Sequence, residues 1–153
     1  MLLRTFTRRC STNTTDTIKK FLKRSDSGFD RVLSKVKILK CENGQCLAEL
    51  KVEEEHTNPL HGLHGGLSAT LIDNITTFAL FTYEKSYMVP SVSVDMHVSY
   101  LKGATMGDEI VIDAQTLRAG KTLAFLKCEI RNKETGDLLV TGSHTKYLMQ
   151  SKK

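Results

Sequence analysis

The chain has 153 residues, of which 40% are hydrophobic and 25% charged, values that are ordinary for one globular domain with a sizeable core. No apolar run reaches the length of a membrane span, so we expect no transmembrane segment. The net charge of +5 is unevenly placed, since residues 1–24 hold seven basic side chains and one acid, which leaves −1 for the remainder. A nearly neutral body argues against nucleic acid as a partner.

The first residues, MLLRTFTRRCSTNTT, are rich in Arg, Ser and Thr and precede the first acid, Asp16. This composition is typical of a mitochondrial presequence, and a disordered basic tail on a cytoplasmic protein is the open alternative. We therefore expect a basic, presequence-like segment over 1–27 and one folded domain over 28–150. The pattern over 16–34 predicts a short amphipathic helix that packs with Ile18, Phe21, Leu22 and Phe29.

Two segments of β-forming residues, 35–41 and 45–52, flank Asn43-Gly44, the strongest short signal for a hairpin. In that hairpin Cys41 and Cys46 would lie opposite each other. A disulfide between them is geometrically conceivable, but free thiols are favoured in a reducing compartment. The four cysteines lack CxxC spacing, so we expect no metal site.

The stretch from residue 61 to 83 predicts a glycine turn that opens onto one long apolar helix, buried on most sides. At its start, His64-Gly65-Gly66 combines free backbone N–H groups with the positive end of the helix dipole, which favours an anion. Inside the helix stands Asp73, and a buried carboxylate needs partners. It either bonds Thr70, Asn74, Thr77 or water, or it is a working carboxylate.

Four strands are predicted after this helix, over 90–101, 109–117, 123–132 and 138–148. In the first of them, alternation predicts that Val92, Val94, Met96 and Val98 face the core and that Ser93 faces the other way. One helix cannot cover both faces of a parallel sheet. We therefore predict an α+β fold in which an antiparallel sheet wraps around one long central helix.

The spacing of Gly65 and Asp73 has a consequence for assembly. Eight residues of helix separate them by about 12 Å, so one substrate atom cannot touch both groups on the same helix. If both serve one site, two helices must lie antiparallel across a twofold axis, which predicts an obligate homodimer with shared sites. The combination points to attack on a carbonyl, with an oxyanion held by helix amides and water activated by a carboxylate.

The sequence resembles the hotdog-fold thioesterases of the PaaI type. The resemblance covers roughly residues 28–148 and rests on VEEEHTN, the HGGL…ATL.DN block, SVDM and GKTLAF. It implies a dimer, two of which form a tetramer, and hydrolysis of medium- to long-chain fatty acyl-CoA. CoA is then part of the substrate, and no cofactor is expected.

The resemblance also implies roles for individual residues. Asp73 would act as general base or nucleophile, and the Gly65 amide would form the oxyanion hole. His64 would orient the thioester, Asn58 the carbonyl or water, and Ser93 the water opposite Asp73. His144 would lie near the site. Residues implied to contact the substrate are Tyr100, Leu101, Lys102, Gly103, Ala104, Thr105, Arg118, Ala119, Gly120, Lys121, Thr122, Leu123, Lys146, Tyr147 and His144.

Two other functions stay open. A hydratase on the same scaffold would need a His/Asp pair at the helix start, which the spacing of His64 and Asp73 does not provide. A non-catalytic acyl-CoA-binding module would bind the same ligand without releasing a free thiol. A thiol-release assay separates these functions from hydrolysis.

Overall fold

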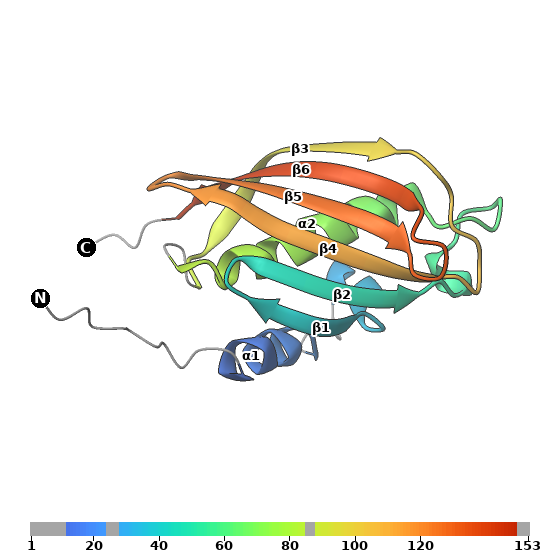
Figure 1. The fold of residues 1–153 in the computed structure, drawn as a ribbon, viewed down its shortest axis with the longest axis horizontal. Coiled ribbons are helices and arrows are strands. Elements are labelled where there is room, and N and C mark those ends of the chain that lie inside the picture. Colours follow the sequence, from blue (N-terminus) through green and yellow to red (C-terminus); the bar gives the residue numbers. More distant parts are fainter. Residues whose placement is uncertain (1–11, 24–27, 85–87, 150–153) are drawn as a thin grey trace, which may run out of the picture.

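The computed structural model describes residues 12–23, 28–84 and 88–149. Two helices, two short 3-10 turns and six strands make up this part of the chain (Figure 1). In chain order they are α1 (Thr12–Lys23), η1 (Phe29–Leu33), β1 (Lys37–Glu42), β2 (Gln45–Lys51), η2 (Glu54–His56), α2 (Gly65–Phe81), β3 (Ser91–Tyr100), β4 (Glu109–Ala119), β5 (Leu123–Asn132) and β6 (Leu138–Leu148).

The six strands form one antiparallel sheet in the order β1-β2-β4-β5-β6-β3. The sheet curves around α2, which lies against its inner face (Figure 1). Leu71, Ile72 and Ile75 of α2 are fully buried, as are Ile112 on β4 and Ile130 on β5. The core therefore sits between one helix and one sheet, and the predicted α+β architecture is confirmed.

The β1–β2 hairpin forms where the sequence predicts it. Asn43 and Gly44 have φ of 51° and 79°, the positive values that a tight hairpin turn requires. Cys41 and Cys46 lie opposite each other, and both are free thiols. The prediction of opposed, unlinked cysteines is confirmed.

A row of small side chains crosses the inner face of the sheet beneath α2. The strand pairings line up Cys41, Cys46, Ala114, Cys128 and Gly142, one each from β1, β2, β4, β5 and β6. A Cβ added at Gly142 would lie 2.9 Å from Ile72 Cδ1, closer than carbon atoms approach without strain. The row lets α2 lie close to the sheet, because no branched side chain keeps the two layers apart.

Helix α1 covers the outer edge of the sheet at β1 (Figure 1). Ile18 and Leu22 are buried in the main core, as predicted. The Thr15 hydroxyl donates to the Cys41 carbonyl (3.0 Å) and accepts from the Cys41 amide (3.2 Å). It thereby satisfies main-chain groups that an edge strand leaves open.

The single helix predicted over 16–34 is wrong in its bounds. Helix α1 starts at Thr12, and Phe29–Leu33 is a separate 3-10 turn, entered through Gly28 with φ of 76°. Phe29 is 72% exposed rather than packed, because this turn buries Leu33 instead. The predicted boundary at residue 27 falls within 24–27, outside the described residues, as do residues 1–11 of the presequence-like segment.

Helix α2 is buried on most but not all sides. A stripe of small and polar residues is at least partly exposed along its outer side, formed by Gly66, Thr70, Asp73, Asn74 and Thr77. These positions recur at helical spacing, so they share one face. In the described part of the chain, no helix is both long and apolar enough to cross a membrane.

The predicted alternation of β3 is broken at Val94. The pairing with β6 shifts register between Ser93 and Asp95, as in a β-bulge, which leaves an extra residue without a partner and re-aims its neighbours. Ser93 and Tyr100 both reach α2 although seven residues separate them. Of the predicted core face, Val98 packs on the core, but Val92, Val94 and Met96 are 51%, 60% and 36% exposed, so that part of the prediction is wrong.

Candidate active site

The first half of the candidate site is the start of α2. His64 is the N-cap residue, and its Nδ1 accepts a hydrogen bond from the Gly66 amide (2.9 Å). The Gly65 amide has no hydrogen-bond partner among the described residues, as expected for the first N–H of a helix. The Tyr100 ring lies over Gly65, where an added Cβ would be 3.3 Å from the ring. Because glycine has no Cβ, the Tyr100 ring can lie against the helix start without displacing the Gly65 amide.

Asn58 belongs to the loop that leads into the helix. Its Oδ1 accepts hydrogen bonds from the amides of Leu60 (2.9 Å) and Gly62 (3.2 Å). This is a turn role, which is common for an Asn before a proline. The loop is tied to the helix start, since the His64 amide donates to the His56 carbonyl (2.9 Å). The loop that carries Asn58 is thus held beside the start of α2.

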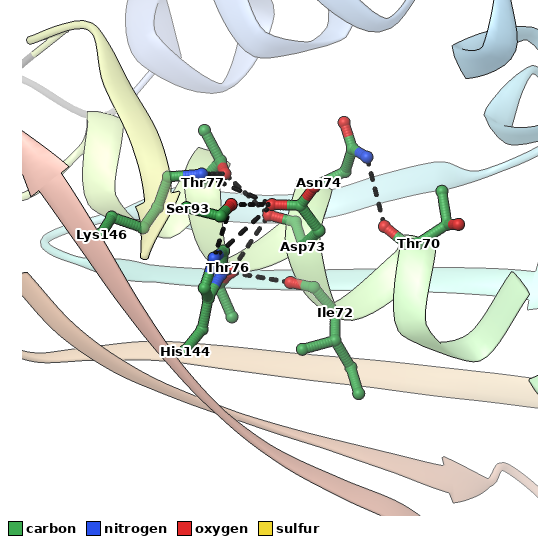
Figure 2. Close-up of polar contacts among 9 residues, drawn as sticks. All are labelled: Thr70, Ile72, Asp73, Asn74, Thr76, Thr77, Ser93, His144 and Lys146. Carbon is green, nitrogen blue, oxygen red and sulfur yellow. Dashed lines mark hydrogen bonds and ion pairs between the residues drawn. The ribbon is translucent and has the colours of Figure 1, made fainter. Parts of the chain in front are cut away.

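The second half of the site is a polar cluster around Asp73 (Figure 2). Three side chains approach the same carboxylate oxygen, Oδ1: Ser93 Oγ at 3.2 Å, Lys146 Nζ at 3.4 Å and His144 Nε2 at 3.6 Å. They come from β3 and β6, and Ser93 pairs with Lys146 across these strands. The strand register therefore brings the cluster together, from residues far apart in the sequence.

The Asp73 side chain is 44% exposed in the single chain, so it can face water, one of the alternatives that the sequence left open. Its carboxylate bonds Ser93 and Lys146 rather than Thr70, Asn74 or Thr77. Thr77 instead donates to the main-chain carbonyl of Asp73 (2.7 Å), and Asn74 to that of Thr70 (3.2 Å). The carboxylate is thus held from the sheet side and open on the other.

His144 is buried, and both of its ring nitrogens have hydrogen-bond partners. Nδ1 lies 2.7 Å from the Thr76 hydroxyl, and Nε2 lies 2.9 Å from the Ser93 hydroxyl. Because the Ser93 hydroxyl donates to Asp73 Oδ1 (3.2 Å), His144 is linked to the carboxylate through Ser93. Burial, aided by the positive charge of Lys146, lowers the pKa of His144 to about 4, which keeps the ring neutral at pH 7.

Lys146 is a buried cation, with only 4% of its surface exposed. Its ammonium donates to Thr77 Oγ1 (2.8 Å) and to Asp73 Oδ1 (3.4 Å). Burial lowers the pKa of Lys146, while the neighbouring Asp73 carboxylate acts in the opposite direction. The partly exposed face of α2 thus brings together four groups: a carboxylate, a hydroxyl, a neutral imidazole and a buried ammonium.

Comparison with known proteins agrees with this geometry. Residues 61–139 match the thioesterase superfamily, and that stretch contains both Gly65 and Asp73. The chain belongs to the thioesterase superfamily.

Within this superfamily the chain is similar to acyl-coenzyme A thioesterase 13 of Homo sapiens, with 50% identity over 120 residues, 78% of this chain and 84% of that protein. The Mus musculus protein is 51% identical over 121 residues, covering 79% and 85% of the two chains. Among solved structures, zebra fish thioesterase superfamily member 2 superposes with a TM-score of 0.84 at 44% identity, over 88% of this chain and 98% of that one.

In this thioesterase-superfamily chain, the predicted substrate contacts separate into two groups at opposite ends of α2. The segment 100–105 lies at the helix start: Tyr100 donates to the Gly65 carbonyl (3.0 Å), and Ala104 accepts from the Leu63 amide (2.8 Å). The segment 118–123 lies at the helix end, where Ala119 packs in one cluster with Leu80. Lys146, which the resemblance places among the CoA contacts, lies instead against Asp73.

The predicted catalytic residues divide in the same way. Asn58, His64 and Gly65 lie at the helix start, and Asp73 and Ser93 lie about two turns further along, or about 12 Å away by helix geometry. One chain therefore presents two half-sites. Neither the catalytic nor the substrate-contacting groups come together within a single chain.

Sequence reasoning missed Thr76, which orients His144. The available signal was a threonine three residues after Asp73, which places it on the adjacent face of the helix. Its contact with a histidine 68 positions later depends on the tertiary fold, and helical spacing alone does not indicate it.

Proposed function

We propose that this chain is an acyl-CoA thioesterase that hydrolyses medium- to long-chain fatty acyl-CoA to a free fatty acid and CoA. The observation that carries the proposal is Asp73, a carboxylate anchored on one side by Ser93 and open on the other. Its proximity to a serine suits a base that activates a bound water. The similar human and mouse proteins are named acyl-coenzyme A thioesterase 13, which supports the substrate class.

In the proposed reaction, the oxygen of water attacks the thioester carbonyl carbon and Asp73 takes up the water proton. Ser93, whose hydroxyl donates to Asp73 Oδ1 (3.2 Å), would accept a hydrogen bond from that water through a lone pair and hold it in line. The negative charge on the carbonyl oxygen is stabilised by the Gly65 amide and the helix dipole. The intermediate then expels CoA as a thiolate, which takes up a proton, so water is the only second reactant.

The complete site requires two chains, since the Gly65 amide and Asp73 of one helix are too far apart. Two features support a homodimer with antiparallel helices. The polar stripe on α2, which carries Asp73, is at least partly exposed in one chain. In addition, β3, the strand that carries Ser93, forms the edge of the sheet, and its Val92 and Val94 are exposed. Each site would take Asn58, His64 and Gly65 from one subunit and Asp73 and Ser93 from the other.

The same arrangement brings the two substrate-contacting segments to one site. Residues 100–105 of one subunit would lie beside residues 118–123 of the other, because these segments occupy opposite ends of antiparallel helices. Arg118 and Lys121 on the second segment suit the phosphate groups of CoA, since a planar fork and a compact charge both bind phosphates. A tetramer made from two such dimers is part of the proposal.

The test is release of free thiol from acyl-CoA substrates with chains of 2 to about 18 carbons. We expect the highest kcat/KM for chains of about 10 carbons or more, and Asp73→Asn should lower kcat by about 10²–10⁴-fold, the range for loss of a general base. The variant should keep its thermal midpoint and oligomeric state. Tight binding of acyl-CoA by the wild-type protein without thiol release would show a non-catalytic binding module instead.

A further inference from the structure

Lys146 has a more unusual environment than any other described lysine, and the proposed reaction does not yet use it. A lysine is almost never fully buried without a partner, because desolvation of its charge is costly. Here the side chain is 95% removed from solvent, since its relative exposure is 5%. Its ammonium therefore needs the two oxygen partners that it has.

The first partner, Thr77, fixes where the ammonium can lie. Thr77 Oγ1 donates its own proton to the Asp73 carbonyl (2.7 Å), so it accepts from Lys146 Nζ (2.8 Å). Thr77 stands one helical turn after Asp73. The ammonium is therefore anchored to the same helix face as the carboxylate.

The second partner is the carboxylate itself. Lys146 and Ser93 both reach Oδ1 of Asp73, and they come from paired positions on β6 and β3. Among the described residues, no hydrogen bond reaches the other oxygen, Oδ2. The carboxylate thus has one oxygen held by side chains of the sheet (Figure 2) and one that carries no hydrogen bond among the described residues.

We propose that Lys146 is a positioning residue for hydrolysis: its ammonium fixes Oδ1 of Asp73, so that Oδ2 points toward the attacking water. This inference rests on the proposed function, and it differs from a role of Lys146 in gripping the phosphates of CoA. A phosphate grip would require the ammonium to leave Thr77 and Asp73 and reach solvent. The burial of Lys146 opposes that movement.

The electrostatics agree with this geometry. The titratable groups nearest to the ammonium are Asp73 on α2 and His144 on β6, and Asp95 on β3 acts on His144. Burial lowers the pKa of Lys146 below its usual 10.5. The ammonium should therefore lose its proton, and its hold on Asp73, at an alkaline pH below that value.

The experiment compares kcat and KM for Lys146→Met, Lys146→Arg and a control, Lys127→Met, which removes an exposed lysine on β5. We expect Lys146→Met to lower kcat roughly 10- to 100-fold, the order of loss for a misplaced catalytic group, with KM changed less than about threefold. The control should match the wild type. A raised KM with unchanged kcat would overturn the proposal in favour of a phosphate contact.

The pH profile provides a readout that a purely structural role would not change. Wild-type kcat should fall at alkaline pH as Lys146 loses its proton. The Lys146→Arg variant should recover part of the activity lost in the Met variant, and its kcat should stay constant over pH 8–10, since arginine does not titrate there. An alkaline decline in the Arg variant identical to that of the wild type would contradict the proposal.

Two further variants keep the test decisive. If Lys146→Met does not fold, Thr77→Val, which removes the anchor of the ammonium, should lower kcat severalfold at unchanged KM, and an unchanged kcat would overturn the inference. Asp73→Asn separates the two proposals. The role of Lys146 alone fails if the wild type releases thiol, Asp73→Asn releases none, and Lys146→Met is fully active. The proposed function fails if the wild type itself releases no thiol.

Discussion

At the scale of residues, two hydroxyl groups hold the ring of His144. Thr76 Oγ1 lies 2.7 Å from Nδ1, and Ser93 Oγ lies 2.9 Å from Nε2. A protonated ring would be a buried charge beside the Lys146 ammonium, so burial and Lys146 lower the pKa of His144. The fold therefore favours the neutral ring.

This neutral histidine predicts a pH dependence of stability. The pKa of His144 is about 4 in the folded chain against an ordinary 6.5, so between these values the unfolded chain binds a proton that the folded chain does not. The free energy of unfolding should be unaffected by this group above about pH 6.5. It should fall by on the order of 2 kcal/mol as the pH is lowered to about 4.5.

Urea unfolding of the wild type and of His144→Asn at pH 7 and 4.5 checks this prediction. The variant should lose less stability than the wild type over this interval. His97→Asn, which alters an exposed histidine on β3, should behave as the wild type does. Equal losses in all three proteins would contradict the assignment of a neutral, buried His144.

At the scale of elements, α1 is part of the folded body, although its sequence lies in the presequence-like segment. Ile18 is fully buried, Leu22 is 6% exposed, and Thr15 bonds the main chain of β1. The described structure therefore includes residues N-terminal to the predicted domain boundary. If a leader is removed in mitochondria, the fold favours cleavage before Thr12.

Two truncations test this interpretation. A chain that starts at residue 12 should unfold at the same urea concentration as the full chain. A chain that starts at residue 28 loses the burial of Ile18 and Leu22, worth about 1.5–3 kcal/mol each, and should unfold earlier and aggregate through the uncovered β1 edge. Equal stability of the two truncated chains would show that α1 is dispensable, and the mass of the protein recovered from mitochondria would locate any cleavage.

The elements that the sequence predicted well are those set by local chemistry. Asn43-Gly44 determines its turn through positive φ, and the apolar run of α2 determines its helix. The face assignment of β3 failed because its register shift depends on pairing with β6, which alternation along one strand does not reveal. Ser93 was identified through resemblance, and the contacts of Lys146 and Thr76 with residues about 70 positions away follow from strand register.

At the scale of the whole molecule, the two edges of the sheet differ. The β1 edge is covered by α1, whereas β3 forms the other edge (Figure 1). On β3, Val92 and Val94 are exposed. An uncovered edge strand with exposed apolar residues is a site for pairing with another chain. The partial exposure of Asp73 has the same explanation if a second subunit covers it.

A charge on this edge should separate the subunits. Val94→Lys is expected to give a folded monomer by analytical ultracentrifugation, with thiol release lowered more than about 10-fold, because each site would lose the half that its partner supplies. Leu39→Lys, at an exposed position on β1, is the matched control and should stay dimeric and active. A monomeric Val94→Lys protein with full activity would show that one chain contains a complete site.

The register shift at Val94 also affects how mutagenesis of β3 is interpreted and how insertions or deletions in this strand would act. Ser93 points toward α2 because the strand contains one extra residue at Val94, and this effect needs no particular side chain. An alanine scan through β3 would therefore not reveal the register shift. Loss or gain of one codon there would rotate Ser93 away from Asp73 while leaving every proposed catalytic residue present in the protein.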